Sequence, residues 1–265
     1  MHPMIQLGLR AARSAAEQFV RIRERIENAH EEYNLDRLLE DTARNAETLI
    51  LHQLTRSYPQ HGVSGRYTPV AEGSGEGRDY HWSIEPIHGH SNLRVASRDF
   101  ALSLVCSFRG RPEHAIVIRP FDDDEYMASR GRGAQCNGKR LRVTRRTELL
   151  GARIALGLPE AATRSRHLPD YLSVLQQLGP QVTTQYASGC GLLDMLELAA
   201  GRVDVGFVLG IEEQDSQVGT LFLKEAGALM GGLDGGPNVA VDGALMAASP
   251  RLYKTLVQQL KPHVS

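Results

Sequence analysis

The feature that most constrains the fold is a change in hydrophobic spacing along the chain. Up to residue 54, apolar residues recur at spacings of three and four, which predicts two amphipathic helices. The second helix runs from about Leu38 to Leu54 and must end before Pro59. The first helix carries its buried stripe at Ile5, Leu9, Ala12, Ala16 and Phe19.

Short runs of β-forming residues follow, separated by Gly, Pro or Asp turns, and these predict an antiparallel sheet. The expected strands cover residues 81–87, 100–108, 114–118 and 125–129. Residues 62–77 are rich in Gly, Ser, Pro and Thr, which predicts a long loop before the first strand. Helices followed by such strands indicate a layered α+β arrangement.

The remainder of the chain alternates strand-like and helical segments and predicts a second lobe. We expect strands over 152–158 and 203–209, and helices over 168–178, 191–200, 215–226 and 249–260. With 265 residues, the chain is long enough for two lobes packed into one compact unit. We place the lobes at residues 1–147 and 148–265.

Composition narrows the function classes. No apolar run approaches the roughly 20 residues that cross a bilayer, and no secretory signal is visible, so we expect a cytoplasmic protein with no membrane contact. The three cysteines are too few for a disulfide framework, so we expect free thiols. A formal net charge of -1 argues against a protein that coats nucleic acid through its overall charge.

One dense basic run remains between residues 130 and 146. Such a run is either a solvated face or a contact surface for nucleic acid or a protein partner, and the sequence leaves both interpretations open. Its cationic residues are Arg130, Arg132, Lys139, Arg140, Arg142, Arg145 and Arg146.

Residues 82–92 read W-S-I-E-P-I-H-G-H-S-N. This resembles the signature W-x-x-D-P-[LI]-D-G-T-x-N of the magnesium-dependent inositol monophosphatase family. Further similarity to that family, and most of all to its bacterial SuhB branch, lies in residues 1–4, 57–61, 129–138, 199–204 and 225–227. Several segments in one order are far stronger support than a single motif.

The resemblance implies a five-layer α/β/α/β/α sandwich, a homodimer, and a magnesium site that hydrolyses inositol monophosphate. For the SuhB branch it also implies a role in ribosomal RNA transcription antitermination that does not require phosphatase chemistry. Transcription proteins, RNA or a small phosphorylated ligand are therefore the expected partners.

The family's metal positions carry different residues in this chain. The resemblance places the paired glutamates on Arg66 and Tyr67, the two aspartates on Glu85 and His88, the main-chain carbonyl on Ile87, and the last aspartate on Asp215. Over four of these positions the family's formal charge of -4 becomes -1, from Arg66 (+1), Glu85 (-1), His88 (0) and Asp215 (-1). Magnesium prefers carboxylate and other oxygen ligands, so we expect a degenerate site with weak or no metal binding.

The residues that activate water in the family are also replaced. Their positions fall on Ala43 and His90, and neither side chain reproduces an aspartate–threonine pair. Glu40 or Asp41 could take over if the helix were shifted.

These substitutions leave three functions open. We expect a non-catalytic SuhB-like regulatory factor; the alternatives are a residual magnesium-dependent phosphomonoesterase, using Glu72 or Glu76 as an added ligand, and an anion sensor built on Arg66. Glu85, His88 and His90 could also hold zinc, although polar filling is the simpler interpretation. Asp215 is equally well explained as a ligand relic or as a helix cap.

Overall fold

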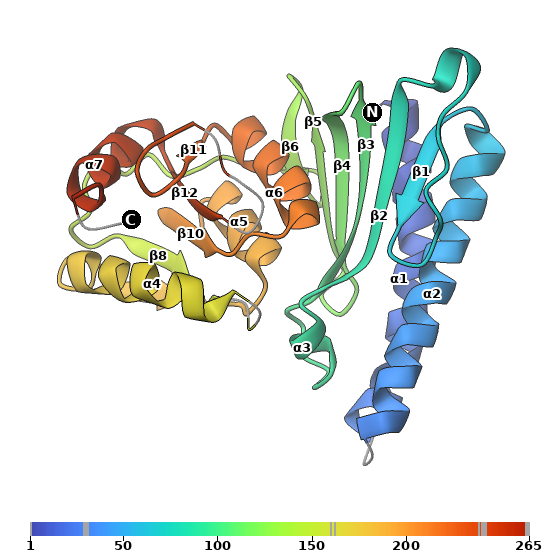
Figure 1. The fold of residues 1–265 in the computed structure, drawn as a ribbon, viewed down its shortest axis with the longest axis horizontal. Coiled ribbons are helices and arrows are strands. Elements are labelled where there is room, and N and C mark those ends of the chain that lie inside the picture. Colours follow the sequence, from blue (N-terminus) through green and yellow to red (C-terminus); the bar gives the residue numbers. More distant parts are fainter. Residues whose placement is uncertain are drawn as a thin grey trace. The chain divides into compact units, whose positions relative to one another are not determined.

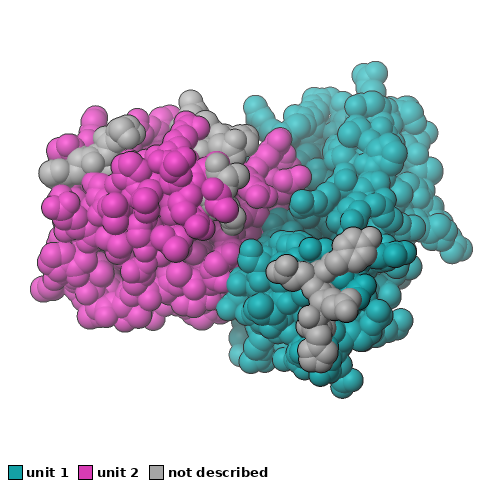
Figure 2. Space-filling model, turned by 60° about the horizontal axis from the view of Figure 1, so that its bottom comes forward, with its two compact units in different colours: residues 1–139 teal, residues 140–265 magenta. Residues whose placement is uncertain are grey.

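The chain divides between Lys139 and Arg140 into two units, coloured separately in Figure 2. The computed structural model describes residues 2–28, 32–159, 161, 163–237, 239 and 243–262. Sequence analysis places the division at residue 148, and the lobes 1–147 and 148–265 stay a prediction. No helix within these described ranges is both long enough and apolar enough to cross a membrane.

Unit 1 begins with two long helices, α1 (Pro3–Glu27) and α2 (Glu32–Ser57) (Figure 1). The ring of His2 accepts a hydrogen bond from the backbone N–H of Met4 at 3.3 Å, and Pro3 takes the first helical position, where no backbone donor is needed. Both predicted helices are confirmed, and each is longer than its apolar stripe.

A seven-stranded sheet follows, with its strands in sequence order. Strand β1 runs parallel to β2, and the pairs from β2 to β6 are antiparallel. The short helix α3 (His90–Leu93) and a 3-10 turn at Gly75–Gly77 lie between strands. The strands are β1 (Gly62–Gly65), β2 (Tyr80–His88), β3 (Ala101–Phe108), β4 (Arg111–Arg119), β5 (Asp124–Ser129), β6 (Gly133–Cys136) and β7 (Lys139–Arg140).

Two sequence expectations for this sheet are wrong. The segment 62–77 is not a loop throughout, because its first four residues form β1 and Val63 also bridges Ala71. The sheet is not wholly antiparallel, because β1 joins its edge in parallel. A four-residue strand with glycine at both ends carries almost no strand signal, and pairing with β2 decides its conformation.

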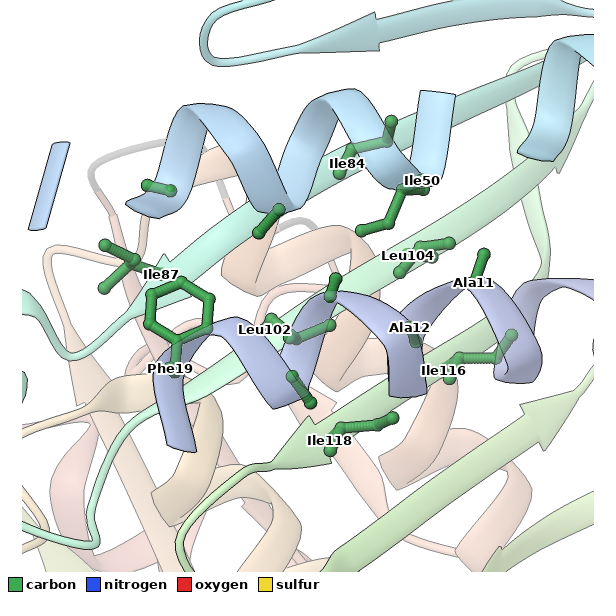
Figure 3. Packing of buried hydrophobic residues seen from close by; sticks show 14 of the residues in the cluster. Ala11, Ala12, Phe19, Ile50, Ile84, Ile87, Leu102, Leu104, Ile116 and Ile118 are labelled. Atoms are coloured by element: carbon green, nitrogen blue, oxygen red, sulfur yellow. The ribbon is translucent and has the colours of Figure 1, made fainter. Parts of the chain in front are cut away.

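The core of unit 1 lies between the two long helices and one face of the sheet. Figure 3 shows Phe19 of α1 beside Ile87, and Ile50 of α2 near Ile84 and Leu104 of the strands. The fully buried Phe19 ring alone contributes about 1.5–3 kcal/mol. Helix α1 approaches the sheet closely at Gly8, where an added Cβ would lie 2.5 Å from Ile116 Cδ1.

Unit 2 is a five-stranded sheet in the order β11-β12-β10-β8-β9 with helices on both faces. Residues of α4 and α7 share one apolar cluster with the strands, whereas Gly206 on the other face lies against Leu198 of α5. The elements are β8 (Arg153–Leu156), α4 (Arg164–Leu178), β9 (Thr184–Tyr186), α5 (Gly191–Ala199), β10 (Val205–Leu209), α6 (Glu213–Ala226), β11 (Leu229–Gly231), β12 (Ala244–Ala248) and α7 (Pro250–Leu260).

The predicted helices and strands of the second lobe are present, and three more strands, β9, β11 and β12, were not predicted. Strand β12 is rich in alanine and methionine, which favour helices in isolation, so its pairing with β10 and β11 overrides local propensity. Helix α4 begins at Arg164 and contains Pro169, which removes one backbone donor without ending the helix.

Candidate functional site

The residues of unit 1 that sequence analysis assigns to the family's metal positions lie where β1 and β2 run side by side. Because Gly65 pairs with Ile84 in a parallel register, the next residues, Arg66 and Glu85, are also neighbours. Arg66 Nη1 lies 3.8 Å from Glu85 Oε1, and the Glu85 side chain is only 7% exposed. The structure therefore brings together the two positions that sequence analysis assigned to opposite charges.

The remaining positions on β2 are bonded within the unit. The backbone N–H of Ile87 donates to Glu85 Oε1 at 3.3 Å, and a register shift separates Glu85 from His88. His88 is buried, and its Nε2 lies 2.8 Å from Ser103 Oγ on β3. Burial and the nearby Arg66 guanidinium lower the pKa of His90, which favours a neutral imidazole.

Tyr67 is anchored from both sides. Its ring lies under the guanidinium of Arg44, 4.8 Å away, and its backbone N–H donates to both carboxylate oxygens of Glu47 at 3.0 and 3.2 Å. Burial raises the pKa of the Tyr67 phenol. A Cβ on Gly65 would collide with the Glu47 carboxylate, so glycine leaves the space that this carboxylate fills.

Sequence reasoning missed Glu47, whose fully buried carboxylate holds the backbone at Tyr67. A signal was present, because Glu47 lies on the same helical stripe as Ala43, Ala46 and Ile50, where a charge is unexpected. A carboxylate inside a predicted apolar stripe indicates a buried hydrogen-bonding role.

The residue that sequence analysis assigns to the family's water-activating aspartate lies in the core. Ala43 is fully buried in the unit 1 cluster. Glu40 and Asp41 do not replace it, because both lie on the exposed face of α2, paired with Arg44 at 3.0 Å and Arg37 at 3.8 Å. Neither Glu40 nor Asp41 therefore takes the place of the missing aspartate at position 43.

The donors of unit 1 do not fit a magnesium site. Mg²⁺ needs several hard oxygen ligands, and here a guanidinium and an imidazole occupy two of the family positions. Among the described residues, no three or more His, Cys, Asp or Glu side chains are grouped closely enough to hold a metal. The same observation opposes the zinc alternative at Glu85, His88 and His90.

Asp215, in unit 2, lies in the first turn of α6 but acts on a neighbouring helix. Its Oδ2 accepts the backbone N–H of Leu192 at 3.1 Å, at the start of α5. The carboxylate thus satisfies a free donor and complements the positive end of the α5 dipole. The N-cap residue of α6 is Glu212, and Asp215 is the third residue of that helix.

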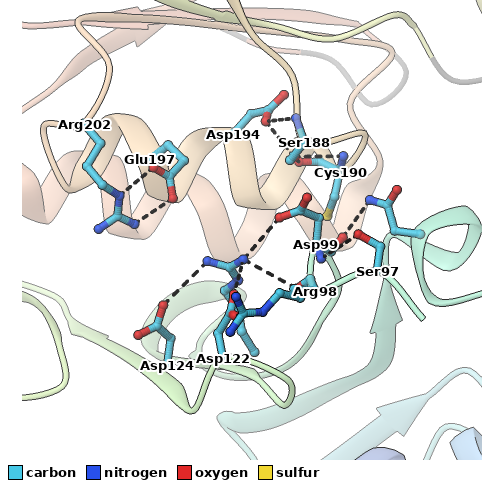
Figure 4. A network of polar contacts seen from close by, with 12 residues as sticks. Ser97, Arg98, Asp99, Asp122, Asp124, Ser188, Cys190, Asp194, Glu197 and Arg202 are labelled. Atoms are coloured by element: carbon cyan, nitrogen blue, oxygen red, sulfur yellow. Dashed lines mark hydrogen bonds and ion pairs between the residues drawn. The ribbon is translucent and has the colours of Figure 1, made fainter. Parts of the chain in front are cut away.

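The same end of α5 carries a second buried polar cluster (Figure 4). Ser188 donates to Asp194 through its hydroxyl at 2.6 Å and through its backbone N–H at 3.0 Å. Burial raises the pKa of the nearby Cys190 thiol well above its ordinary value, so it remains protonated. This cluster fixes the turn into α5 and offers no activated nucleophile.

The segment Ser57–His61, which contributes to the family resemblance, is held by aromatic packing. The His61 ring stacks between Tyr58, at 4.6 Å, and Tyr80, at 4.8 Å. The indole N–H of Trp82 donates to His61 Nδ1 at 3.1 Å. These contacts join the end of α2 to β2 and explain the segment by packing alone.

The basic run divides into paired and unpaired cations. Arg130 donates to the carbonyl of Pro112 and lies 3.2 Å from Glu113, and Arg146 lies 3.4 Å from the buried Asp204. The other cations are exposed, and no ion pair joins them to any described residue; we call them the basic segment. They are Arg132, Lys139, Arg140, Arg142 and Arg145.

Other arginines of unit 1 contrast with the basic segment. Arg98 lies 2.6 Å from Asp122, and Arg119 contacts Asp99, Asp122 and Asp124 (Figure 4). Pairing with a carboxylate is therefore common among the arginines of unit 1, whereas the two cations of the basic segment in that unit, Arg132 and Lys139, form no ion pair with a described residue.

Comparison with known proteins identifies the family. The profile of the inositol monophosphatase family matches residues 1–265. Nus factor SuhB of Pseudomonas aeruginosa is 37% identical over 266 residues, covering 100% of this chain and 98% of that protein. Nus factor SuhB of Escherichia coli K12 is 31% identical over 267 residues with the same coverage of both chains.

Solved structures show the same fold. The extragenic suppressor protein SuhB of Bartonella henselae superimposes with a TM-score of 0.84 at 23% identity, over 99% of this chain and 100% of that one. An inositol monophosphatase of Anabaena gives a TM-score of 0.80 at 22% identity, over 98% and 96%. The predicted layered α/β fold and the SuhB-like resemblance are confirmed, and this chain belongs to the inositol monophosphatase family.

Proposed function

We propose that this chain is a SuhB-type factor in transcription antitermination that acts by binding partners and not by phosphate-ester hydrolysis. The relatives named Nus factor SuhB, matched over the whole chain, support the transcriptional part. The observation that carries the non-catalytic part is the Arg66–Glu85 pair, which puts a fixed positive charge where hydrolysis would need a metal ligand. For this role we also propose a cytoplasmic homodimer.

The basic segment is the proposed partner surface. Its cations are exposed and form no ion pair with a described residue, so an anionic partner can bind them without first breaking such a pair. RNA phosphates and acidic protein surfaces both present suitable charge. Arg130, although in the same run, is a weaker candidate because its guanidinium is bonded to Pro112 and Glu113.

Charge reversal tests this proposal. The triple variant Arg132→Glu, Arg140→Glu, Arg142→Glu should lose binding to the antitermination proteins or leader RNA and should lose readthrough of a terminator in reconstituted transcription. A matched control reverses Arg10, Arg56 and Arg251, which are also exposed and also lack an ion pair to any described residue. Equal readthrough by the triple variant and the parent would contradict the proposal.

Residual phosphatase activity is the second candidate, because Glu85 and Asp215 remain carboxylates at family ligand positions. The direct test is magnesium-dependent hydrolysis of inositol 1-phosphate by the purified protein, with calorimetry for Mg²⁺ on the same sample. We expect neither turnover nor binding at millimolar Mg²⁺. Lithium-sensitive turnover would replace our proposal with this one.

A restoration variant separates a lost metal site from a lost substrate pocket. Arg66→Glu, His88→Asp and Ala43→Asp together return three family residues. Activity that appears only in this variant would mean that the pocket persists. Binding of inositol phosphate by the parent without turnover would favour the anion-sensor alternative on Arg66.

A further inference from the structure

We infer that the Arg66 guanidinium replaces a divalent cation as the counter-charge of the buried Glu85 carboxylate, so that unit 1 reaches its native fold with no bound metal. This inference concerns what holds the fold together. It therefore stands whether or not the chain acts in transcription.

The need for a counter-charge comes from burial. The Glu85 side chain is 7% exposed and lies in the middle of the β2 segment that packs against α2 and β3. A buried carboxylate is strongly unfavourable unless hydrogen bonds and an opposite charge compensate for the lost water. One backbone donor, the N–H of Ile87, contributes a hydrogen bond but no net charge.

The backbone delivers Arg66 to this carboxylate. On one side Gly65 is fixed by its register with Ile84 and by the Glu47 carboxylate packed against it. On the other side the backbone N–H of Tyr67 is bonded to that same carboxylate. With both neighbours anchored, the Arg66 side chain has a short reach to Glu85, and its Nη1 lies 3.8 Å from Oε1.

The Arg66–Glu85 pair carries no net charge. Arg66 contributes +1 and Glu85 contributes -1, and the other buried carboxylate of this loop, Glu47, is bonded to the Tyr67 N–H. A divalent ion would add two positive charges within a few ångströms of a guanidinium, and beside the buried Glu85 carboxylate this repulsion is weakly screened.

The first experiment uses the full chain without substitution. Thermal unfolding in EDTA and in millimolar Mg²⁺ should give melting temperatures that agree within about 1 °C, since a ligand that does not bind the native state does not stabilise it. Mn²⁺, followed by electron paramagnetic resonance, should remain free in solution. A melting temperature that rises with Mg²⁺, or tightly bound Mn²⁺, would overturn the inference even if the protein is active in transcription.

Variants test the guanidinium itself. Arg66→Gln should lower the melting temperature by roughly 2–4 °C, and Glu85→Gln in that background should restore most of it. The matched control is Arg37→Gln, because Arg37 also lies 3.8 Å from its partner, Asp41, but both of those side chains are exposed. Equal melting temperatures for Arg66→Gln and Arg37→Gln would contradict the counter-charge role.

Arg66→Glu reverses the charge and provides the complementary result. It should melt at a lower temperature than the parent in EDTA and recover partly when Mg²⁺ is added, because two carboxylates then need a cation. If this variant does not fold, the Mg²⁺ and Mn²⁺ measurements on the parent still decide the question.

Discussion

The positive charge beside Glu85 and the positive charge of the basic segment differ in what surrounds them. Arg66 lies 3.8 Å from a buried carboxylate and is positioned by bonded neighbours on both sides. The five cations of the basic segment are exposed and form no ion pair with a described residue. The difference lies in pairing and not in exposure, because the Arg66 side chain is itself 60% exposed. We propose that the first charge serves the fold and that the second is available to a partner.

We expect the largest loss of stability from a substitution at Glu47, because its carboxylate anchors the loop that carries Arg66. Glu47→Ala should destabilise the protein by about 3–5 kcal/mol, because it leaves the Tyr67 N–H without its acceptor and opens a cavity beside Gly65. Chemical denaturation with a constant m-value would measure this change.

Glu40→Ala is the control for that variant. Glu40 lies on the same helix but is exposed, and its ion pair with Arg44 is a surface i,i+4 pair. We expect a change of no more than about 0.5 kcal/mol. Similar losses for both variants would mean that burial does not distinguish the anchor from the surface.

His114 should make the stability of unit 1 depend on pH. This buried residue lies near Arg132 of the basic segment. Its ring contacts that of His2, and Nδ1 lies 3.0 Å from Ser129 Oγ. Burial first, and then the positive charges of His2 and Arg132, lower the pKa of His114 to about 4.

The sign of the pH dependence follows from that lowered pKa. Between the ordinary pKa near 6.5 and about 4, the unfolded chain binds a proton that folded His114 does not. Stability should therefore be unaffected by this residue above pH 7, and it should fall by up to about 3 kcal/mol as the pH drops to 4. Denaturation across this range should show a shallower slope for His114→Gln; an unchanged slope would exclude His114 as the source.

Unit 2 contains Asp215, which sequence analysis assigns to a family metal position and which here accepts the Leu192 N–H. Asp215→Ala removes the acceptor of the Leu192 N–H at the start of α5, and we expect a loss of about 1 kcal/mol. Asp215→Asn keeps an acceptor and should lose less. If both variants are as stable as the parent, the bond to Leu192 does not contribute measurably.

Much of the fold could be predicted from the sequence, because the strongest signals were periodic. The stripe through Ile5 and Phe19 gave α1, and the β-forming runs gave the strands from β2 to β5. Strand β1 and the alanine-rich β12 could not be predicted, because each is short and its conformation is decided by pairing with another strand and not by its own residues.

The candidate site could be predicted as a set of residues but not as a set of contacts. The family resemblance marked Arg66 and Glu85, and only the parallel register of β1 with β2 brings them within 3.8 Å. The sequence marked seven cations between residues 130 and 146, and only the three-dimensional structure separates Arg130 and Arg146 from the unpaired ones. Both distinctions depend on tertiary partners that no local pattern names.

We expect the smallest change in stability from substitutions in the basic segment. Arg140→Ala and Arg142→Ala should each change the free energy of unfolding by less than about 0.5 kcal/mol, because neither side chain has an ion pair to a described residue that could be lost. If RNA is the partner, each variant should weaken binding and reduce its dependence on salt concentration, since one fewer phosphate is neutralised. A substantial loss of stability in either variant would show that these cations also serve the fold. The basic segment would then resemble Arg66 in serving the fold, and the proposal that it is a partner surface would be weakened.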